Sequence, residues 1–123
     1  MKPSLVIAAI AFSVALVNAQ TAPSPAAQAQ APTGNSDAGK KLFSTIGCWQ
    51  CHGYEGQGGS AGPRIAPKPI AWTAFSKYVR KPTNQMPPFT EKVVTDTDLA
   101  NIYAYLQSRP VPPPVASIPL LQQ

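Results

Sequence analysis

The residues of this chain best suited to chemistry lie within five positions, Cys48-Trp49-Gln50-Cys51-His52. Two thiols at this spacing lie about one helical turn apart, so both can react with groups on one edge of a planar ring system. The adjacent imidazole can then coordinate a metal at the centre of the ring. Because C-x-x-C-H is the attachment motif for c-type haem, Cys48 and Cys51 are predicted to form thioethers and His52 to bind the iron.

Three other interpretations of the motif compete with haem attachment. A thioredoxin-like redox pair opens a helix after a strand, but no β-branched strand precedes Cys48. Structural zinc takes about four ligands, whereas Cys48, Cys51 and His52, the only histidine, supply at most three. At ordinary residue frequencies, a chain of this length would contain the motif by chance in fewer than about one case in a thousand. One covalent haem c is therefore the predicted cofactor.

Met86 is the candidate for the second axial ligand. It is the only methionine besides Met1. A lone methionine is usually a core residue, but its thioether is also the soft neutral ligand that, opposite a histidine, raises the reduction potential of a haem iron. Pro87 restricts Met86 to extended backbone conformations, and Pro82 and Pro88 stiffen the same loop. The predicted metal ligands are therefore His52 and Met86.

With these residues, the chain resembles the small class I cytochromes c over most of residues 37–109. The similarity includes Gly39 and Phe43 in a first helix, Gly62-Pro63 after the motif, and a single methionine before an aromatic last helix. The resemblance implies an all-α cytochrome c fold, with three to five short helices around one covalently bound haem.

The same resemblance implies a surrounding shell for the haem. It makes the Pro63 carbonyl the acceptor for the second ring nitrogen of His52 and places Ile65 against the haem. Trp49 is expected near the haem edge or partly exposed. Four residues are candidates to contact the propionate groups at the edge of the haem: Arg64, Trp72, Tyr78 and Arg80. For Arg64, a solvated position in the loop is an equal alternative.

Hydrophobic spacing predicts helices on both sides of the motif. The first starts at Ser36 or Asp37 and runs to about Ile46. A middle helix covers about 70–81. All eight glycines lie between positions 34 and 62, so the segment 53–62 is expected to form an irregular loop along one face of the haem.

A last helix is predicted to start at Thr95. The spacing of Thr95 to Asp98 resembles a capping box, and apolar residues follow at helical intervals. The resemblance packs this helix across the first one, with Gly39 against Tyr105 or Ile102. A glycine inside a helix is costly unless another segment approaches closely at that point.

The flanking segments are predicted to lie outside the folded domain. Residues 1–19 have the charged start, short apolar run and small residues before the cleavage point of a signal peptide. Residues 20–36 form an uncharged Ala/Pro/Gln linker, and the cytochrome domain of 37–109 begins directly after it at Asp37. The tail, 110–123, contains five prolines, so helix and central strand are not expected there. The apolar run from Leu5 to Val17 is shorter than the roughly 20 apolar residues of a membrane helix, so no stable membrane insertion is expected once the signal peptide is cleaved.

The charge pattern favours a protein partner. The net charge is +5, from 10 Lys and Arg against 5 Asp and Glu. Nucleic acid is not expected as a partner, because the chain is predicted to be exported and has no basic stripe with interleaved aromatic residues. Five basic residues are expected to ring the haem edge and steer docking on an acidic redox protein, with a generic solvated surface as an equal alternative: Lys40, Lys77, Arg80, Lys81 and Lys92.

These features predict a periplasmic electron-transfer protein, with no catalytic residue of its own. It would carry single electrons between a dehydrogenase or quinol-oxidising complex and a terminal acceptor, either freely or as a subunit of such a complex. The alternative is a haem-based gas or redox sensor in which a diatomic ligand displaces Met86. Peroxidase chemistry would need a distal acid–base group, and His52 is the only histidine.

Overall fold

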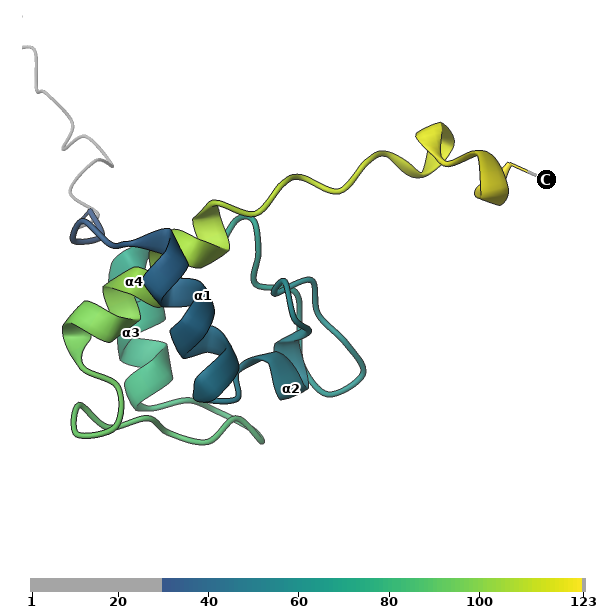
Figure 1. Cartoon of the computed structure of the whole chain (residues 1–123). Coiled ribbons are helices and arrows are strands. Elements are labelled where there is room, and N and C mark those ends of the chain that lie inside the picture. The colour runs from purple at the N-terminus through teal and green to yellow at the C-terminus, as the bar shows by residue number, and fades with distance from the viewer. Residues whose placement is uncertain (1–29, 123) are drawn as a thin grey trace, which may run out of the picture.

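The computed structural model describes residues 30–122 (Figure 1). No strand occurs among these residues, so the predicted all-α class is confirmed. The predicted signal peptide and residues 20–29 of the predicted linker lie outside the described residues. The elements in chain order are α1 (Ser36–Thr45), α2 (Trp49–His52), α3 (Trp72–Arg80), α4 (Asp96–Gln107), and two 3₁₀ turns, η1 (Val115–Ser117) and η2 (Pro119–Leu121).

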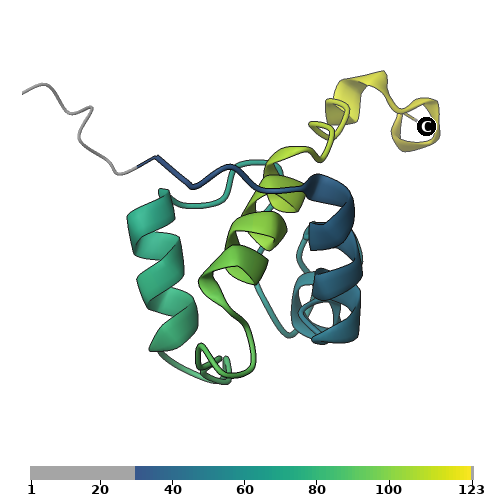
Figure 2. The same cartoon turned by 60° about the vertical axis from the view of Figure 1, so that its left-hand side comes forward.

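Helices α1 and α4 pack closely against each other (Figure 2). Gly39 makes this approach possible, because a Cβ at this position would overlap the carbonyl oxygen of Asn101. The same Cβ would lie 2.9 Å from Cβ of Tyr105, which confirms the predicted contact between Gly39 and Tyr105. The rings of Phe43 and Tyr105 then meet with centroids 5.5 Å apart, and both side chains are buried.

Side-chain caps begin both of these helices. Oδ1 of Asn35 accepts a hydrogen bond from the Ala38 amide at 2.8 Å, which sets the start of α1. Oγ1 of Thr95 accepts from the Asp98 amide at 3.1 Å, and Oδ2 of Asp98 accepts from the Thr95 amide at 3.0 Å. The predicted capping box is therefore confirmed. The observed end of α1, at Thr45, lies one residue before the predicted one.

Helix α3 covers the other side of α4 and lies within the predicted range of 70–81. Its inward face carries Phe75 and Val79, both buried. The ring of Tyr103 on α4 lies 5.0 Å from Phe75 and 5.4 Å from Trp72, measured between centroids. The Tyr103 hydroxyl also donates a hydrogen bond to the Ile70 carbonyl at 3.1 Å, so this aromatic cluster ties the start of α3 to α4.

The boundary predicted between linker and domain at residue 37 is too late. Ala31 packs against the buried core, and a Cβ on Gly34 would overlap the Ala100 carbonyl. The Asn35 amide donates to Oδ1 of Asn101 at 2.7 Å. The chain is therefore held against α4 from about residue 31, because small residues let this segment lie flat on the helix.

The Pro-rich tail leaves the end of α4 and extends away from the helices (Figure 1). The sequence excluded helix here, yet η1 and η2 form single 3₁₀ turns. A turn of three residues uses few amide donors, and Pro119 at the start of η2 lies where its missing N–H costs nothing. Within residues 30–122, no helix has the length and apolar character that a membrane crossing requires.

Candidate functional site

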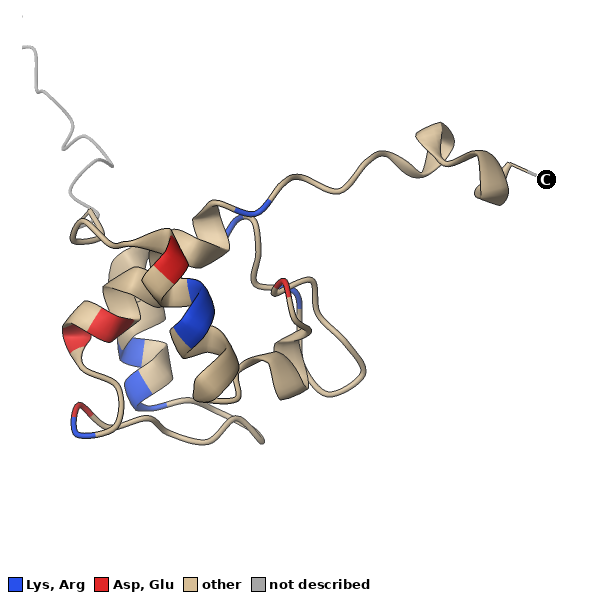
Figure 3. Ribbon diagram, in the orientation of Figure 1, with Lys and Arg blue, Asp and Glu red and all other residues tan. Residues whose placement is uncertain are grey.

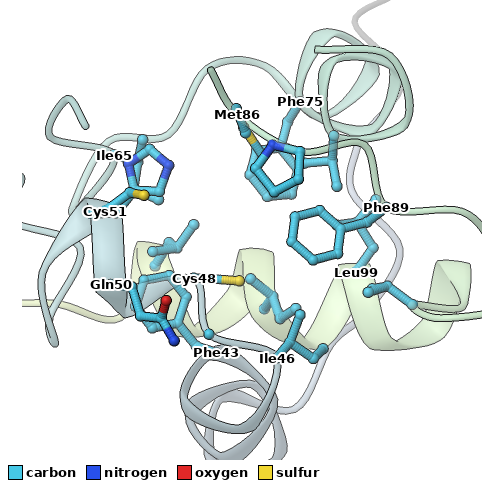
Figure 4. Close-up of a pocket in the computed structure, with 17 residues that line it drawn as sticks. Phe43, Ile46, Cys48, Gln50, Cys51, Ile65, Phe75, Met86, Phe89 and Leu99 are labelled. Atoms are coloured by element: carbon cyan, nitrogen blue, oxygen red, sulfur yellow. The ribbon is translucent and has the colours of Figure 1, made fainter. Parts of the chain in front are cut away.

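The C-x-x-C-H motif lies on one short helical turn. Cys48 has helical backbone angles and immediately precedes α2, which contains Cys51 and His52. Neither thiol forms a disulfide. Both cysteines and His52 line one pocket together with Met86, and Figure 4 shows Cys48, Cys51 and Met86 around this pocket. The structure thus brings all four predicted site residues together.

The orientation of His52 is fixed by the chain that follows it. Its Nδ1 lies 2.8 Å from the Pro63 carbonyl oxygen, as the resemblance implied. Because a carbonyl can only accept, Nδ1 carries the proton and donates it to this bond. In the neutral imidazole, this bond selects the tautomer in which Nε2 has the free lone pair that can coordinate a metal.

Gly62 allows the Pro63 carbonyl to reach His52. A Cβ on Gly62 would lie 2.9 Å from the Cys51 carbonyl oxygen and 3.1 Å from Cβ of Cys51. Such a side chain would push residues 62–63 away from the motif. The Gly58 amide also donates to the His52 carbonyl at 2.7 Å, so the predicted irregular loop lies tightly against the end of α2.

Burial changes the chemistry of the first cysteine. It raises the pKa of the Cys48 thiol from 9.0 to about 11, and the nearby Cys51 adds to the rise. The thiolate is the nucleophilic form of cysteine, so burial lowers the nucleophilicity of Cys48 in the folded pocket relative to an exposed cysteine.

The segment between α3 and α4 carries Met86, and Arg80 holds this segment in place. The Arg80 guanidinium donates to the carbonyls of Phe89 at 3.0 Å and Val94 at 2.6 Å. It also forms a 2.6 Å ion pair with Asp96. The Phe89 amide donates in turn to the Val79 carbonyl at 3.0 Å. Met86 is thereby positioned on the pocket wall.

Two of the candidates for the propionate edge have other roles. Arg80 is committed to the contacts just described and does not line the pocket, so its predicted place at the propionate edge is wrong. Trp72 packs on Tyr103 and Phe75 and does not line the pocket. Trp49 is half-buried and stacks on Tyr54 with centroids 4.5 Å apart.

The pocket has two adjoining lobes. The first, of about 260 Å³, is lined by both cysteines and by core side chains such as Phe43 and Leu99. The second, of about 350 Å³, contains Pro63, Arg64 and Lys68 in its wall. Five residues line both lobes, so they form one continuous space: His52, Ile65, Phe75, Val79 and Met86.

The residues of this space fit a covalently attached haem. The lining is mainly aliphatic and aromatic, which suits the faces of a macrocycle and excludes water. It offers two free thiols, one imidazole with Nε2 available, and one thioether. In residues 30–122, no group of three or more His, Cys, Asp or Glu side chains is placed to hold a bare metal ion.

Sequence reasoning missed the role of Arg80 and the structure of residues 31–35. A basic residue at the end of a helix gives no signal that its partners are carbonyls of a later loop. Asn35, by contrast, precedes Ser36-Asp37 and has the residue type of an N-cap, so this start of the fold was detectable.

Comparison with known families agrees with this geometry. The family model described as cytochrome C oxidase, cbb3-type, subunit III matches residues 34–106, which is more than half of the chain. Comparisons with curated proteins and with solved structures gave no match. The matched range includes the motif, Met86 and helices α1 to α4, except for the last residue of α4. It begins at residue 34, close to residue 31, where the chain starts to pack against α4. The chain therefore belongs to this family, and its folded part is a small monohaem c-type cytochrome domain that acts in haem-based electron transfer.

Proposed function

We propose that this protein is an exported single-electron carrier whose haem c is bound by Cys48, Cys51, His52 and Met86. The observation that supports this most directly is the shared pocket. Two free thiols, a histidine oriented by Pro63 and a lone thioether line the same apolar space. No side chain is assigned an acid–base role.

Each of the four residues has a distinct task in this proposal. The sulfurs of Cys48 and Cys51 would form the thioether bonds, and Nε2 of His52 and the Met86 sulfur would be the two protein ligands of the iron. When bound, the haem supplies an iron that alternates between the ferrous and ferric states. A thioether ligand favours the ferrous state, so Met86 sets a higher reduction potential than a second nitrogen ligand would.

The loop contacts of Arg80 and Tyr78 support fast electron transfer. Arg80 holds the part of the segment that follows Met86, and the Tyr78 hydroxyl lies 3.0 Å from Oγ1 of Thr83, which precedes Met86. A loop that is fixed at several points would hold the Met86 side chain in the same place in both redox states. Little structural reorganisation is then needed when an electron enters or leaves.

The surface charge supports a redox protein with an acidic docking face as the partner. Figure 3 shows basic residues on α1, on α3 and in the loops. Among residues 30–122, only Arg80 and Arg109 form ion pairs. Exposed lysines of α1 and of the α3 region, such as Lys40, Lys77 and Lys81, are therefore available to an approaching protein, and their attraction should weaken as salt rises.

The family description supports a place near a terminal oxidase. It names a subunit of such an enzyme. We propose that the chain passes electrons from a dehydrogenase or quinol-oxidising complex towards a terminal acceptor, either as a free carrier or as a subunit.

The axial ligand is tested by Met86→Leu, with Gln85→Ala as the matched control. Leucine keeps an apolar side chain at position 86 but removes the sulfur, whereas Gln85 is exposed and does not line the pocket. Proteins matured in a periplasm should all contain covalent haem. Met86→Leu should lose the sulfur-to-iron charge-transfer band of the ferric form and show a lower reduction potential. Gln85→Ala should retain both properties.

Carbon monoxide distinguishes the carrier from a gas sensor. The ferrous wild-type protein should keep its spectrum when the gas is added, because Met86 occupies the sixth position. Ferrous Met86→Leu should bind the gas. A wild-type protein that binds carbon monoxide readily would contradict the carrier and support a sensor with a displaceable Met86.

Export is tested separately. The full chain should appear in the periplasmic fraction with haem attached and with Gln20 as its first residue. Deletion of residues 1–19 should leave a cytoplasmic product without covalent haem. Retention of residues 1–19 on the purified haem protein would contradict cleavage.

A further inference from the structure

The two lobes of the haem pocket differ in their chemistry. The first contains both cysteines. The second contains neither cysteine but has two cations, Arg64 and Lys68, in its wall. No aspartate or glutamate lines either lobe. The second lobe is therefore the side of the pocket that favours negative charge.

We propose that Arg64 and Lys68 bind the propionate carboxylates of the haem and so complete its placement in the pocket. This inference rests on the proposed function, because it requires haem attachment at Cys48 and Cys51. The vinyl groups that form the thioethers lie on one side of the macrocycle, and the propionates lie on the other. With the vinyl side held at Cys48 and Cys51 in the first lobe, the carboxylates would be directed towards the second.

The contacts of Arg64 leave its guanidinium able to bind a carboxylate. Its Nε donates to the Gln57 carbonyl at 3.3 Å, which orients the guanidinium and leaves its four terminal N–H donors available. Arg64 also follows Pro63 directly, so one short segment orients the iron ligand His52 and holds the carboxylate. A charge-assisted bond from a guanidinium to a carboxylate is among the stronger hydrogen bonds in proteins.

Lys68 is the second available cation. It is exposed, and it forms no ion pair within residues 30–122. Pro67 and Pro69 flank it and limit the backbone conformations of the segment. Arg80, the other basic candidate near α3, is already bound to two carbonyls and to Asp96. Arg64 and Lys68 are therefore the basic residues of the pocket wall that remain for the propionates.

The inference is tested on the haem-containing protein with Arg64→Gln, Lys68→Gln and the double variant. Lys41→Gln is the control, because it removes the same charge from an exposed position that lines neither lobe. Loss of a cation beside a carboxylate stabilises the ferric state, so the reduction potential should fall in each single variant and fall further in the double variant. The control should remain close to the wild type, and Arg64→Lys should recover most of the potential.

Redox-difference infrared spectra provide a second measurement that a merely structural change would not reproduce. The carboxylate bands of the propionates should shift in Arg64→Gln and Lys68→Gln but not in Lys41→Gln. If the variants carry normally ligated haem and match Lys41→Gln in potential and bands, the propionate assignment is wrong while the proposed function stands. If the wild-type protein holds no covalent haem, the proposed function itself fails.

Discussion

Tyr105 joins three parts of the molecule through a single side chain. Its hydroxyl donates to the Tyr54 carbonyl at 3.0 Å, its ring contacts Phe43, and the guanidinium of Arg109 lies 4.4 Å from its centroid. Burial raises the pKa of Tyr105 above 10.0, and the negative charge of Glu55 raises it further. The folded protein therefore holds the Tyr105 proton more tightly than the unfolded chain does.

This shift predicts a loss of stability in alkali. The contribution of Tyr105 is fully present below its unfolded pKa of 10.0 and is lost as pH rises through the higher folded value. In urea titrations at about pH 9 and about pH 11, Tyr105→Phe should lose less stability between the two conditions than the wild type. At the lower pH it should be less stable by about 1 kcal/mol, because the bond to Tyr54 is missing.

The matched control is Tyr54→Phe, since the Tyr54 side chain is 65% exposed. Between about pH 9 and about pH 11, Tyr54→Phe should lose as much stability as the wild type. Tyr105→Phe should still lose some stability in alkali, because burial also raises the pKa of Tyr103, which the variant retains. Equal alkaline losses in the wild type and in Tyr105→Phe would contradict the assignment.

The contact between α1 and α4 depends on one glycine. A methyl group at position 39 would overlap the Asn101 carbonyl in the facing helix, where the backbone cannot move aside easily. Gly39→Ala should therefore destabilise the folded protein by about 1–3 kcal/mol in urea denaturation, in spite of the better helix propensity of alanine.

Gly59→Ala is the control for the glycine replacement. Its Cβ would meet only the Cys51 carbonyl oxygen at 3.5 Å, an ordinary contact distance. Both substitutions reduce the entropy of the unfolded chain in a similar way, so this effect cancels in their difference, and the better helix propensity of alanine at position 39 can only make the cost of the helix contact look smaller. Gly39→Ala as stable as Gly59→Ala would show that α1 and α4 can separate slightly at little cost.

The haem pocket and the hydrophobic core of the whole molecule share the same side chains. Phe43, Phe75, Val94, Leu99 and Leu106 are buried members of the core, and all of them line the first lobe. The faces that these side chains turn to the lobe would pack against the haem when it is bound. A folded part of this size has little other apolar surface to bury, so the cofactor is expected to supply part of the core.

The haem-free double variant Cys48→Ala/Cys51→Ala should therefore be largely unfolded. Circular dichroism should show much less helix than in the haem-containing protein, and heating should give no cooperative transition. The wild-type protein matured without haem should behave in the same way, which separates loss of the cofactor from loss of the thiols. A cooperative transition in either haem-free protein would show that α1, α3 and α4 pack without the cofactor.

Local sequence patterns predicted the parts of this molecule that local chemistry determines. The spacing of Thr95 and Asp98 indicated the start of α4, and C-x-x-C-H indicated the turn that presents the thiols. The contacts of Arg80 were not predictable in this way. Its acceptor carbonyls belong to Phe89 and Val94, and any residue type has such a carbonyl, so the sequence contains no sign of the pairing.

The start of α1 and the end of α4 meet at one corner of the fold. Oγ of Ser36 lies 2.8 Å from Oγ of Ser108, and both views show the chain entering and leaving on the upper side, with the segment between α3 and α4 below (Figures 1 and 2). A tag or surface linker fused beyond either helix would therefore attach the domain at the same corner. Immobilised on an electrode through either end, the protein should present the same face to solution.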